Sequence, residues 1–259
     1  METVSHDGRT TGYREVRADA DGPTALYIHG SGGSYRAWAQ QYGPEGPTHP
    51  AAALDLSGHG ESEDVDTPAG ARTLAAYADD VSAVAEAVGA DVLVGNSLGG
   101  AVVQHVLLES DCDVTAAVLA GSGAKLTVAD PLRTWLTEDF ERAIEWLHGP
   151  DRLFHDPDEQ TRQRSIETMH AVGQTVTERD FLTCHTFDVR ERLSEIAVPV
   201  LALVGEYDAL TPPTYHEFLA EEIPNGDLTV LDDAAHLAML EQPTAFGTAI
   251  TDFLDAHGV

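Results

Sequence analysis

The feature that most restricts the fold of this chain is an alternation of short, almost continuous apolar runs with segments that favour helices. The apolar runs lie at residues 24–29, 50–56, 91–96, 114–121, 198–205 and 227–233. The helical segments lie at 72–88, 98–109, 213–222 and 243–256. Strands that are apolar throughout are typical of parallel sheets, because connecting helices cover both of their faces. We therefore predict an α/β fold with a mostly parallel sheet, and an antiparallel edge that includes residues 12–19.

Residues 122–190 interrupt this alternation, because they contain no clear strand. Two stretches within them, "WLTEDFERAIEWLHG" and "DEQTRQRSIETMHAV", look helical. An insertion of this length between two core strands exceeds an ordinary connection. We therefore expect a helical cap at 122–190, with the core formed by residues 1–121 and 191–259. The alternative is a pair of ordinary crossover helices with long loops.

Acidic residues dominate the charge of the chain. There are 44 Asp and Glu against 14 Lys and Arg, for a formal net charge of -30, and Lys125 is the only lysine. Such a surface repels itself in dilute buffer, whereas a Debye length of about 3 Å at about 1 M salt screens most of the repulsion. The composition resembles that of cytosolic proteins from salt-accumulating halophiles. It argues against nucleic acid as a partner, because phosphates carry the same sign of charge.

The sequence contains neither an apolar stretch approaching the ~18 residues of a membrane span nor the pattern of a signal peptide at its start. Its two cysteines, Cys112 and Cys184, do not form a disulfide framework. We expect both to be small buried apolar groups, and we expect a cytoplasmic protein with no membrane partner. The sequence leaves open whether the chain forms a homo-oligomer.

The segment Gly95-Asn96-Ser97-Leu98-Gly99 fits the pattern G-x-S-x-G and lies between a predicted strand and a predicted helix. A sharp strand-to-helix turn leaves no space for side chains two residues before and after the serine, which explains both glycines. The N-terminal N–H groups of the helix favour a developing anion near Ser97. We predict that Ser97 is a nucleophile; the alternative is a tight turn without a catalytic role.

A serine hydroxyl needs a base, and the base needs an orienting acid. His236 lies in the loop "DAAH" just after the last predicted strand, and Asp208 follows the strand before it. The order serine, acid, histidine is that of the nucleophile-elbow enzymes. Glu206 is the alternative acid. The alternative for His236 is a polar surface histidine, which is our interpretation of His216 and His257.

The stretch "YIHGSGGS", which follows the first apolar run, can supply backbone donors to an oxyanion. Two N–H groups are needed at about 2.7–3.1 Å from the anion. We assign them to Ser31 and to Leu98, the residue after the serine, with Gly32 as the alternative to Ser31. The alternative function, a phosphate-binding turn, requires G-x-G-x-x-G, and Tyr35 stands where its last glycine would be.

Taken together, these stretches resemble the α/β-hydrolase family of esterases, C–C bond hydrolases, lactonases and cofactor-free haloperoxidases. The matching segments are "HGSGG" with Trp38, "LDLSGHGES", "GNSLGG", "VPVLALVGEYDALTPP" and "AAHLAMLEQP", in the family's order. The resemblance implies an eight-stranded, mostly parallel sheet with helices on both faces and an inserted helical cap, and it implies neither a metal nor a cofactor. One departure is Ala235, where many relatives have glycine. We expect Asp55 and His59 to be structural.

The expected function is that of a carboxylesterase on a small ester, thioester or lactone, with Ser97, His236 and Asp208 as its triad. A C–C bond hydrolase, an acyltransferase, a perhydrolase and a non-catalytic binding protein of the same fold remain alternatives. We expect a moderate, apolar pocket with an acidic rim, which suits neutral acyl groups. No guanidinium clamp for an anionic substrate is evident, because Arg133 and Arg142 lie among acidic residues. The apolar residues expected to line it in part are Trp135, Phe140, Trp146, Leu147, Phe154 and Phe181.

Overall fold

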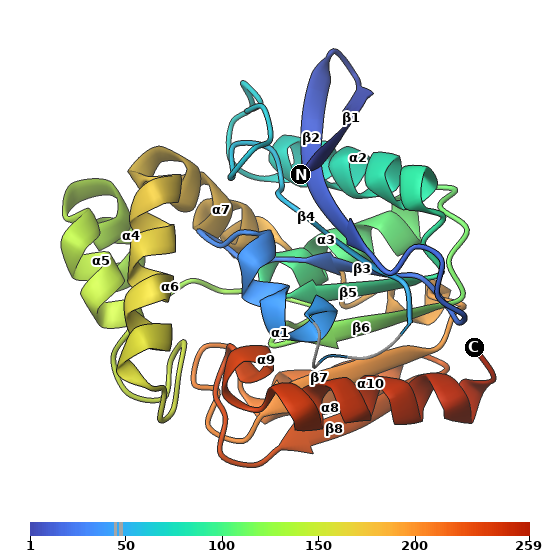
Figure 1. Cartoon of the computed structure of the whole chain (residues 1–259). Helices are drawn as coiled ribbons and strands as arrows, with labels where there is room; N and C mark the ends of the chain where they lie inside the picture. The colour runs from blue at the N-terminus through green and yellow to red at the C-terminus, as the bar shows by residue number, and fades with distance from the viewer. Residues whose placement is uncertain (44–45, 47–48) are drawn as a thin grey trace.

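An eight-stranded sheet forms the centre of the computed structural model, which describes residues 1–43, 46 and 49–259 (Figure 1). The strand order is β1-β2-β4-β3-β5-β6-β7-β8. β1 and β2 are antiparallel to their neighbours and the other pairs are parallel, so the mostly parallel sheet with an antiparallel edge is confirmed. The strands are β1 (Glu2–His6), β2 (Arg9–Val16), β3 (Ala25–Ile28), β4 (Ala51–Leu54), β5 (Val92–Asn96), β6 (Ala116–Ala120), β7 (Val200–Gly205) and β8 (Gly226–Leu231).

The central strands are buried along their whole length, which explains their continuous apolar sequence. Every residue of β3, β5, β6 and β7 is buried. β1 was not predicted, because its residues are exposed or half-buried and include polar side chains such as Ser5. In register, Ile28 pairs with Gly95 and Asn96 pairs with Ala120. The carboxyl ends of β3, β5 and β6 therefore meet at one edge of the sheet.

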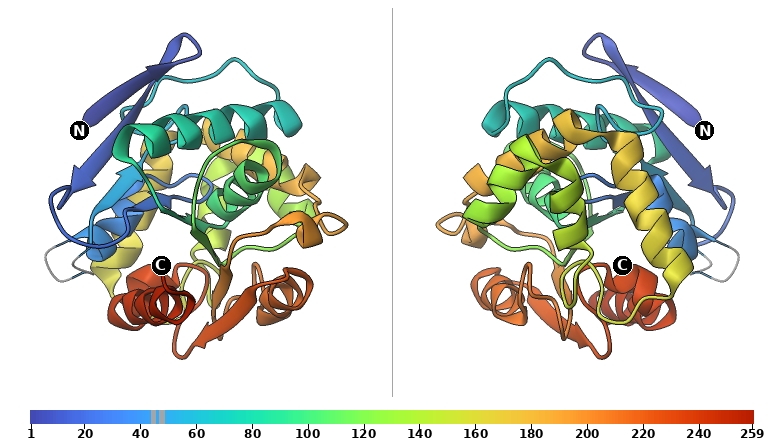
Figure 2. Two further views of the ribbon diagram at one scale, coloured as in Figure 1. Left: turned by 90° about the vertical axis from the view of Figure 1, so that its right-hand side faces the viewer. Right: turned by 90° about the vertical axis from the view of Figure 1, so that its left-hand side faces the viewer.

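Helices cover both faces of the sheet, and Figure 2 shows α2 and α10 on opposite sides of it. The helices of the core are α1 (Ala39–Tyr42), α2 (Ala71–Val88), α3 (Leu98–Glu109), α8 (Pro213–Glu222), α9 (Ala238–Glu241) and α10 (Pro243–His257), with 3-10 turns η1 (Tyr35–Trp38) and η2 (Leu193–Glu195). One apolar core packs α2 and α3 against the sheet, and the other packs Trp38 and Phe246 against its opposite face. Truncation of a buried ring such as that of Phe246 to alanine costs about 3–5 kcal/mol.

Four helices lie between β6 and β7, beyond one end of the sheet in Figure 1. They are α4 (Asp130–Glu138), α5 (Phe140–Leu147), α6 (Glu159–Val172) and α7 (Gln174–Thr186). Acidic side chains begin two of them: Asp139 caps α5 by accepting the N–H of Arg142, and Asp158 caps α6. The two ends of this insertion lie side by side, because the Val189 N–H donates to the Ala124 carbonyl at 2.8 Å.

The helices and the cysteines can be compared with two further expectations from the sequence. Within the described residues, no helix has the length and apolar character that crossing a bilayer requires. Both cysteines are free thiols; Cys184 is buried in α7, as expected, whereas Cys112 is only half-buried.

Candidate active site

Ser97 lies on a sharp elbow between β5 and α3, with φ 55° and ψ -114°. A Cβ atom at Gly95 would lie 2.3 Å from the Gly99 carbonyl oxygen, and one at Gly99 would lie 2.4 Å from the Ile28 carbonyl oxygen. Any side chain at either position would therefore displace the backbone. A positive φ at a residue other than glycine costs about 1–3 kcal/mol and persists only where the surroundings hold it.

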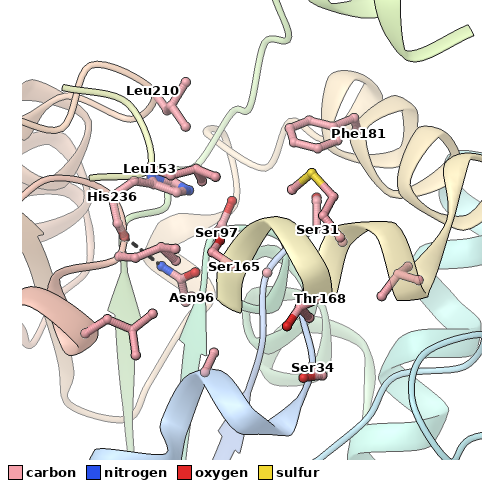
Figure 3. Close-up of a pocket in the computed structure, with 18 of the residues that line it drawn as sticks. Ser31, Ser34, Asn96, Ser97, Leu153, Ser165, Thr168, Phe181, Leu210 and His236 are labelled. Carbon is pink, nitrogen blue, oxygen red and sulfur yellow. Dashed lines mark hydrogen bonds between the residues drawn. The ribbon is translucent and has the colours of Figure 1, made fainter. Parts of the chain in front are cut away.

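The end of β6, the residue Ser122 that follows it and the loop of His236 supply the contacts that hold the elbow. The Ser122 hydroxyl donates to the Ser97 carbonyl at 2.9 Å, and the Ser97 N–H donates to the Ala120 carbonyl at 2.9 Å. The Asn96 side-chain amide donates to the His236 carbonyl at 3.1 Å, the dashed line in Figure 3. This last bond joins the elbow directly to the loop that carries His236.

His236 and Asp208, which the sequence places after β8 and β7, form a buried pair. Nδ1 of His236 lies 2.8 Å from Oδ2 of Asp208, and the two residues are 5% and 2% exposed. The N–H groups of Leu210 and Thr211 each donate to Oδ1 of Asp208 at 2.8 Å, and the Thr211 hydroxyl donates to Oδ2. Glu206, the alternative acid, is exposed and does not meet the imidazole in this structure.

These contacts set the electrostatics of the pair. Burial alone would raise the pKa of Asp208, but the charge of His236 and the hydrogen bonds from His236 and Thr211 hold that pKa below its ordinary value. An ionised Asp208 can only accept, so Nδ1 of His236 must carry a proton and Nε2 is left as the acceptor of the neutral ring. Ser97 and His236 line the same cavity (Figure 3).

The loop after β3 passes next to the elbow. A Cβ atom at Gly30 would lie 3.0 Å from the Ser97 Cβ. The Gly32 N–H donates to Oδ2 of Asp180 at 2.9 Å, so it is already used. Among the described residues, the N–H groups of Ser31 and Leu98 meet no hydrogen-bond acceptor. Of the two candidate donors, only Gly32 is thus already engaged, and Ser31 lines the cavity.

The cavity has a volume of about 960 Å³ and lies between the sheet edge and the inserted helices. Of the apolar residues expected there, Trp146 and Phe181 line it. The other four are absent from its described lining and pack elsewhere: Trp135, Phe140, Leu147 and Phe154. The insertion adds a polar wall that the sequence did not predict, formed by one face of α6: Thr161, Arg164, Ser165 and Thr168.

The cavity lining contains guanidinium groups that the sequence did not indicate. Arg133 and Arg142 lie outside the cavity lining, as expected, with Arg133 paired to Asp130 and Arg142 stacked 4.4 Å from the Trp135 ring. Two other arginines, Arg36 and Arg164, line the cavity. Within the described part of the chain, no group of three or more His, Cys, Asp or Glu side chains is arranged to hold a metal ion.

His216 is not the surface histidine that the sequence suggested. It is 0% exposed, and its Nε2 accepts the Ser122 N–H at 2.9 Å. Burial lowers its pKa to about 4, so the ring is neutral and can accept this bond. The sequence interpretation failed because α8 turns this polar side chain inward, where it supports the elbow through Ser122. His257, by contrast, is exposed at the end of α10.

Comparison with known proteins finds one family, in sequence and in structure. A family model described as the alpha/beta hydrolase family matches residues 25–249. A solved thermophilic esterase is 31% identical, with a TM-score of 0.87 over 99% of this chain and 98% of its own. A pimeloyl-[acyl-carrier protein] methyl ester esterase from Neisseria meningitidis is 29% identical over 93% of this chain and 97% of its own. A 3-oxoadipate enol-lactonase from Acinetobacter baylyi is 26% identical, over 89% and 88%.

Proposed function

The chain belongs to the alpha/beta hydrolase family, and on that premise we propose that it is a serine esterase that hydrolyses small carboxylic esters, thioesters or lactones. The observation that carries the proposal is the buried Asp208–His236 pair beside Ser97 on its strained elbow, all at the same end of the sheet. The esterase names of the relatives support the same reaction class. In this proposal residues 122–190 form the cap, which shapes the substrate cavity.

The proposed mechanism has two half-reactions, and in each of them His236 first takes a proton and then returns it. Nε2 of His236 takes the proton of the Ser97 hydroxyl as its oxygen attacks the carbonyl carbon of the substrate. The N–H groups of Ser31 and Leu98 stabilise the resulting oxyanion. The carbon–oxygen bond to the alcohol then breaks, and His236 returns the proton to the departing oxygen. Water, deprotonated by His236, attacks the acyl-enzyme in the same way and releases the acid.

A second candidate is an ester or lactone hydrolase whose substrate carries a carboxylate away from the reacting carbonyl. Arg36 and Arg164 favour it, because both line the cavity and guanidinium groups bind carboxylates through paired hydrogen bonds. The enol-lactonase relative is compatible with this class. Replacement of either arginine by glutamine should then raise KM for an anionic ester and leave KM for a neutral ester of equal length unchanged. Equal effects on both esters would exclude this candidate.

The esterase proposal is tested by fluorophosphonate labelling and by an ester panel, both at molar salt. Wild-type protein and Ser165→Ala, which removes another hydroxyl from the cavity, should be labelled. Ser97→Ala should lose the label and lose turnover by several orders of magnitude. Labelling that persists in Ser97→Ala would reject the nucleophile, and a wild-type protein that neither labels nor turns over any ester would support a non-catalytic role.

A further inference from the structure

One carboxylate in the inserted helices is fully buried. Asp180 in α7 is 0% exposed, and it is the one acidic residue of the described segment 122–190 that is buried. Carboxylates are almost never fully buried unless they are paired, and this chain places most of its acidic residues at the surface. The burial of Asp180 therefore needs a structural or functional explanation.

Asp180 joins three segments that are far apart in the sequence. Its Oδ2 accepts the backbone N–H of Gly32 at 2.9 Å and faces Nε2 of His59 at 2.9 Å. Its Oδ1 accepts the Tyr77 hydroxyl at 2.6 Å. Gly32 belongs to the loop after β3, His59 to the loop after β4, and Tyr77 to α2. A single carboxylate of the insertion is thus bound to the loop that contains Ser31.

Hydrogen-bond geometry shows that Asp180 pairs with a charged imidazole. Nδ1 of His59 lies 3.2 Å from the carbonyl oxygens of Leu56 and Ser57, which can only accept. Nε2 faces the carboxylate, so both ring nitrogens must carry protons. Burial opposes this charge, but Asp180 outweighs it and raises the pKa of His59. Breaking a buried ion pair of this kind from one side is strongly destabilising, because an unpaired charge is left in the interior.

The bond from Gly32 to Asp180 also fixes the conformation of the glycine-rich loop. Gly32 has φ +63°, and the Gly33 N–H donates to the Gly30 carbonyl at 3.1 Å, so the loop turns at Gly32. A Cβ atom at Gly32 would lie 3.2 Å from the side chain of Thr177, one turn before Asp180 in α7. The Gly30 carbonyl belongs to the same planar peptide group as the Ser31 N–H, so the bond from Gly33 holds that peptide. Only the φ and ψ rotations of Ser31 separate it from the Ser31–Gly32 peptide, which Asp180 anchors.

We propose that Asp180 is a positioning residue through which the insertion holds the oxyanion-binding loop in its reactive conformation. This inference rests on the proposed function, because it gives a role to the Ser31 N–H in stabilising the transition state. Asp180 does not touch the substrate. It acts through the Gly32 peptide, and any displacement of α7 is transmitted to the Ser31 N–H.

The test compares Asp180→Asn with Tyr77→Phe. Asp180→Asn removes the charge that faces His59 and leaves one acceptor oxygen where the carboxylate had two. Tyr77→Phe removes the bond to Oδ1 and a longer one from Arg179 to the Tyr77 hydroxyl, and it leaves Gly32 and His59 bound to Oδ2. Steady-state kinetics on a short ester would be measured together with inhibition by a trifluoromethyl ketone, whose adduct with Ser97 carries an oxyanion. A non-reactive amide analogue of the ester would report ground-state binding.

For Asp180→Asn we expect kcat to fall by about 10–100-fold, somewhat less than for direct loss of an oxyanion donor. The affinity for the trifluoromethyl ketone should fall in parallel, while KM and amide affinity stay within about threefold. Tyr77→Phe should lower the melting temperature and leave kcat and ketone affinity close to wild type. A folded Asp180→Asn variant with wild-type kcat would overturn the proposal, as would equal losses of ketone and amide affinity.

A measurement on the wild-type protein covers the case in which Asp180→Asn does not fold. The Gly32 amide should be strongly protected from hydrogen exchange, because it donates to a buried carboxylate; a rapidly exchanging Gly32 amide would contradict the proposal. The esterase proposal fails by a different measurement: either fluorophosphonate labelling persists in Ser97→Ala, or the wild-type protein is not labelled. Neither result depends on Asp180.

Discussion

Oδ2 of Asp208 meets Nδ1 of His236 at 2.8 Å while Oδ1 of the same carboxylate accepts two backbone N–H groups. Both oxygens are therefore occupied, and the carboxylate cannot rotate without breaking bonds in a buried site. This arrangement fixes the orientation of the imidazole as well as its tautomer, so that Nε2 is free to accept a proton.

Replacing Asp208 by asparagine should lower kcat by up to about 10⁴-fold, because the amide group can donate to Nδ1 and stabilise the wrong tautomer. The matched control is Glu206→Gln, which removes an exposed carboxylate from the same loop and should leave kcat unchanged. The measurement is kcat for a short p-nitrophenyl ester at molar salt. A large loss in Glu206→Gln with a small one in Asp208→Asn would reverse the assignment of the acid.

The elbow could be predicted from the sequence because its constraint is local. Gly95 and Gly99 are required by contacts with backbone atoms within or beside the turn, and an apolar strand precedes them. The choice between Asp208 and Glu206 could be narrowed but not decided, since both follow the same strand. Only the path of the loop, which buries Asp208 and exposes Glu206, distinguishes them.

The polar side chains that line the cavity could not be predicted, because their position depends on packing between segments far apart in the sequence. The cavity-facing side of α6 carries Arg164 and Ser165, and a helix face of this kind is indistinguishable in sequence from a solvent-exposed one. Asp180 was equally hidden among 44 acidic residues, because nothing near it in the sequence shows that Gly32 and His59 are its partners.

Phe181 should limit the length of the acyl group, because it projects into the cavity from α7 (Figure 3). We expect wild-type protein to prefer short p-nitrophenyl esters. Phe181→Ala should raise kcat/KM for longer chains relative to short ones, and Phe140→Ala, which truncates an aromatic ring outside the cavity lining, should not. The ratio of kcat/KM for hexanoate to that for acetate measures the effect. An identical ratio in wild type and both variants would show that Phe181 does not contact the acyl group.

Stability should fall as the pH drops from about 6.5 to about 4. Burial lowers the pKa of both His29 and His216 to about 4, so the unfolded chain binds their protons more tightly than the folded protein does. Each therefore reduces the free energy of unfolding by up to about 1.4 kcal/mol per pH unit in this window. His59, whose pKa is raised, has the opposite sign and loses its contribution only above about 6.5.

Urea denaturation at several pH values and constant molar salt measures this dependence. His216→Gln keeps an acceptor for the Ser122 N–H and removes one titrating group, so its stability should vary less steeply with pH than that of wild type. An unfolding free energy that is constant between pH 4 and 6.5 would show that neither buried histidine resists protonation.

Salt should be required for the folded state, because the net charge is -30 and cations are few. Several arginines form ion pairs with nearby carboxylates, including Arg190 with Asp188 and Arg179 with Asp64. We expect folded, active protein in molar KCl or NaCl and progressive unfolding toward about 10 mM salt, as screening is lost. Circular dichroism during dilution measures this, with sucrose as a control for water activity. Full activity at about 10 mM salt would reject the halophilic interpretation.

The paired ends of the insertion have a consequence for how such proteins diversify. The segments entering and leaving it run side by side at Ala124 and Val189. We therefore expect that recombination can exchange the four helices as a module at this single junction. The bond from the Gly32 N–H to Asp180 is a separate connection between the insertion and the core. A transplanted module without an acceptor at the position of Asp180 would bring a new substrate specificity. It would also leave the glycine-rich loop of the core without the contact that orients it. Active chimeras should therefore take the α7 carboxylate and the glycine-rich loop from the same parent, whereas the rest of the module can vary.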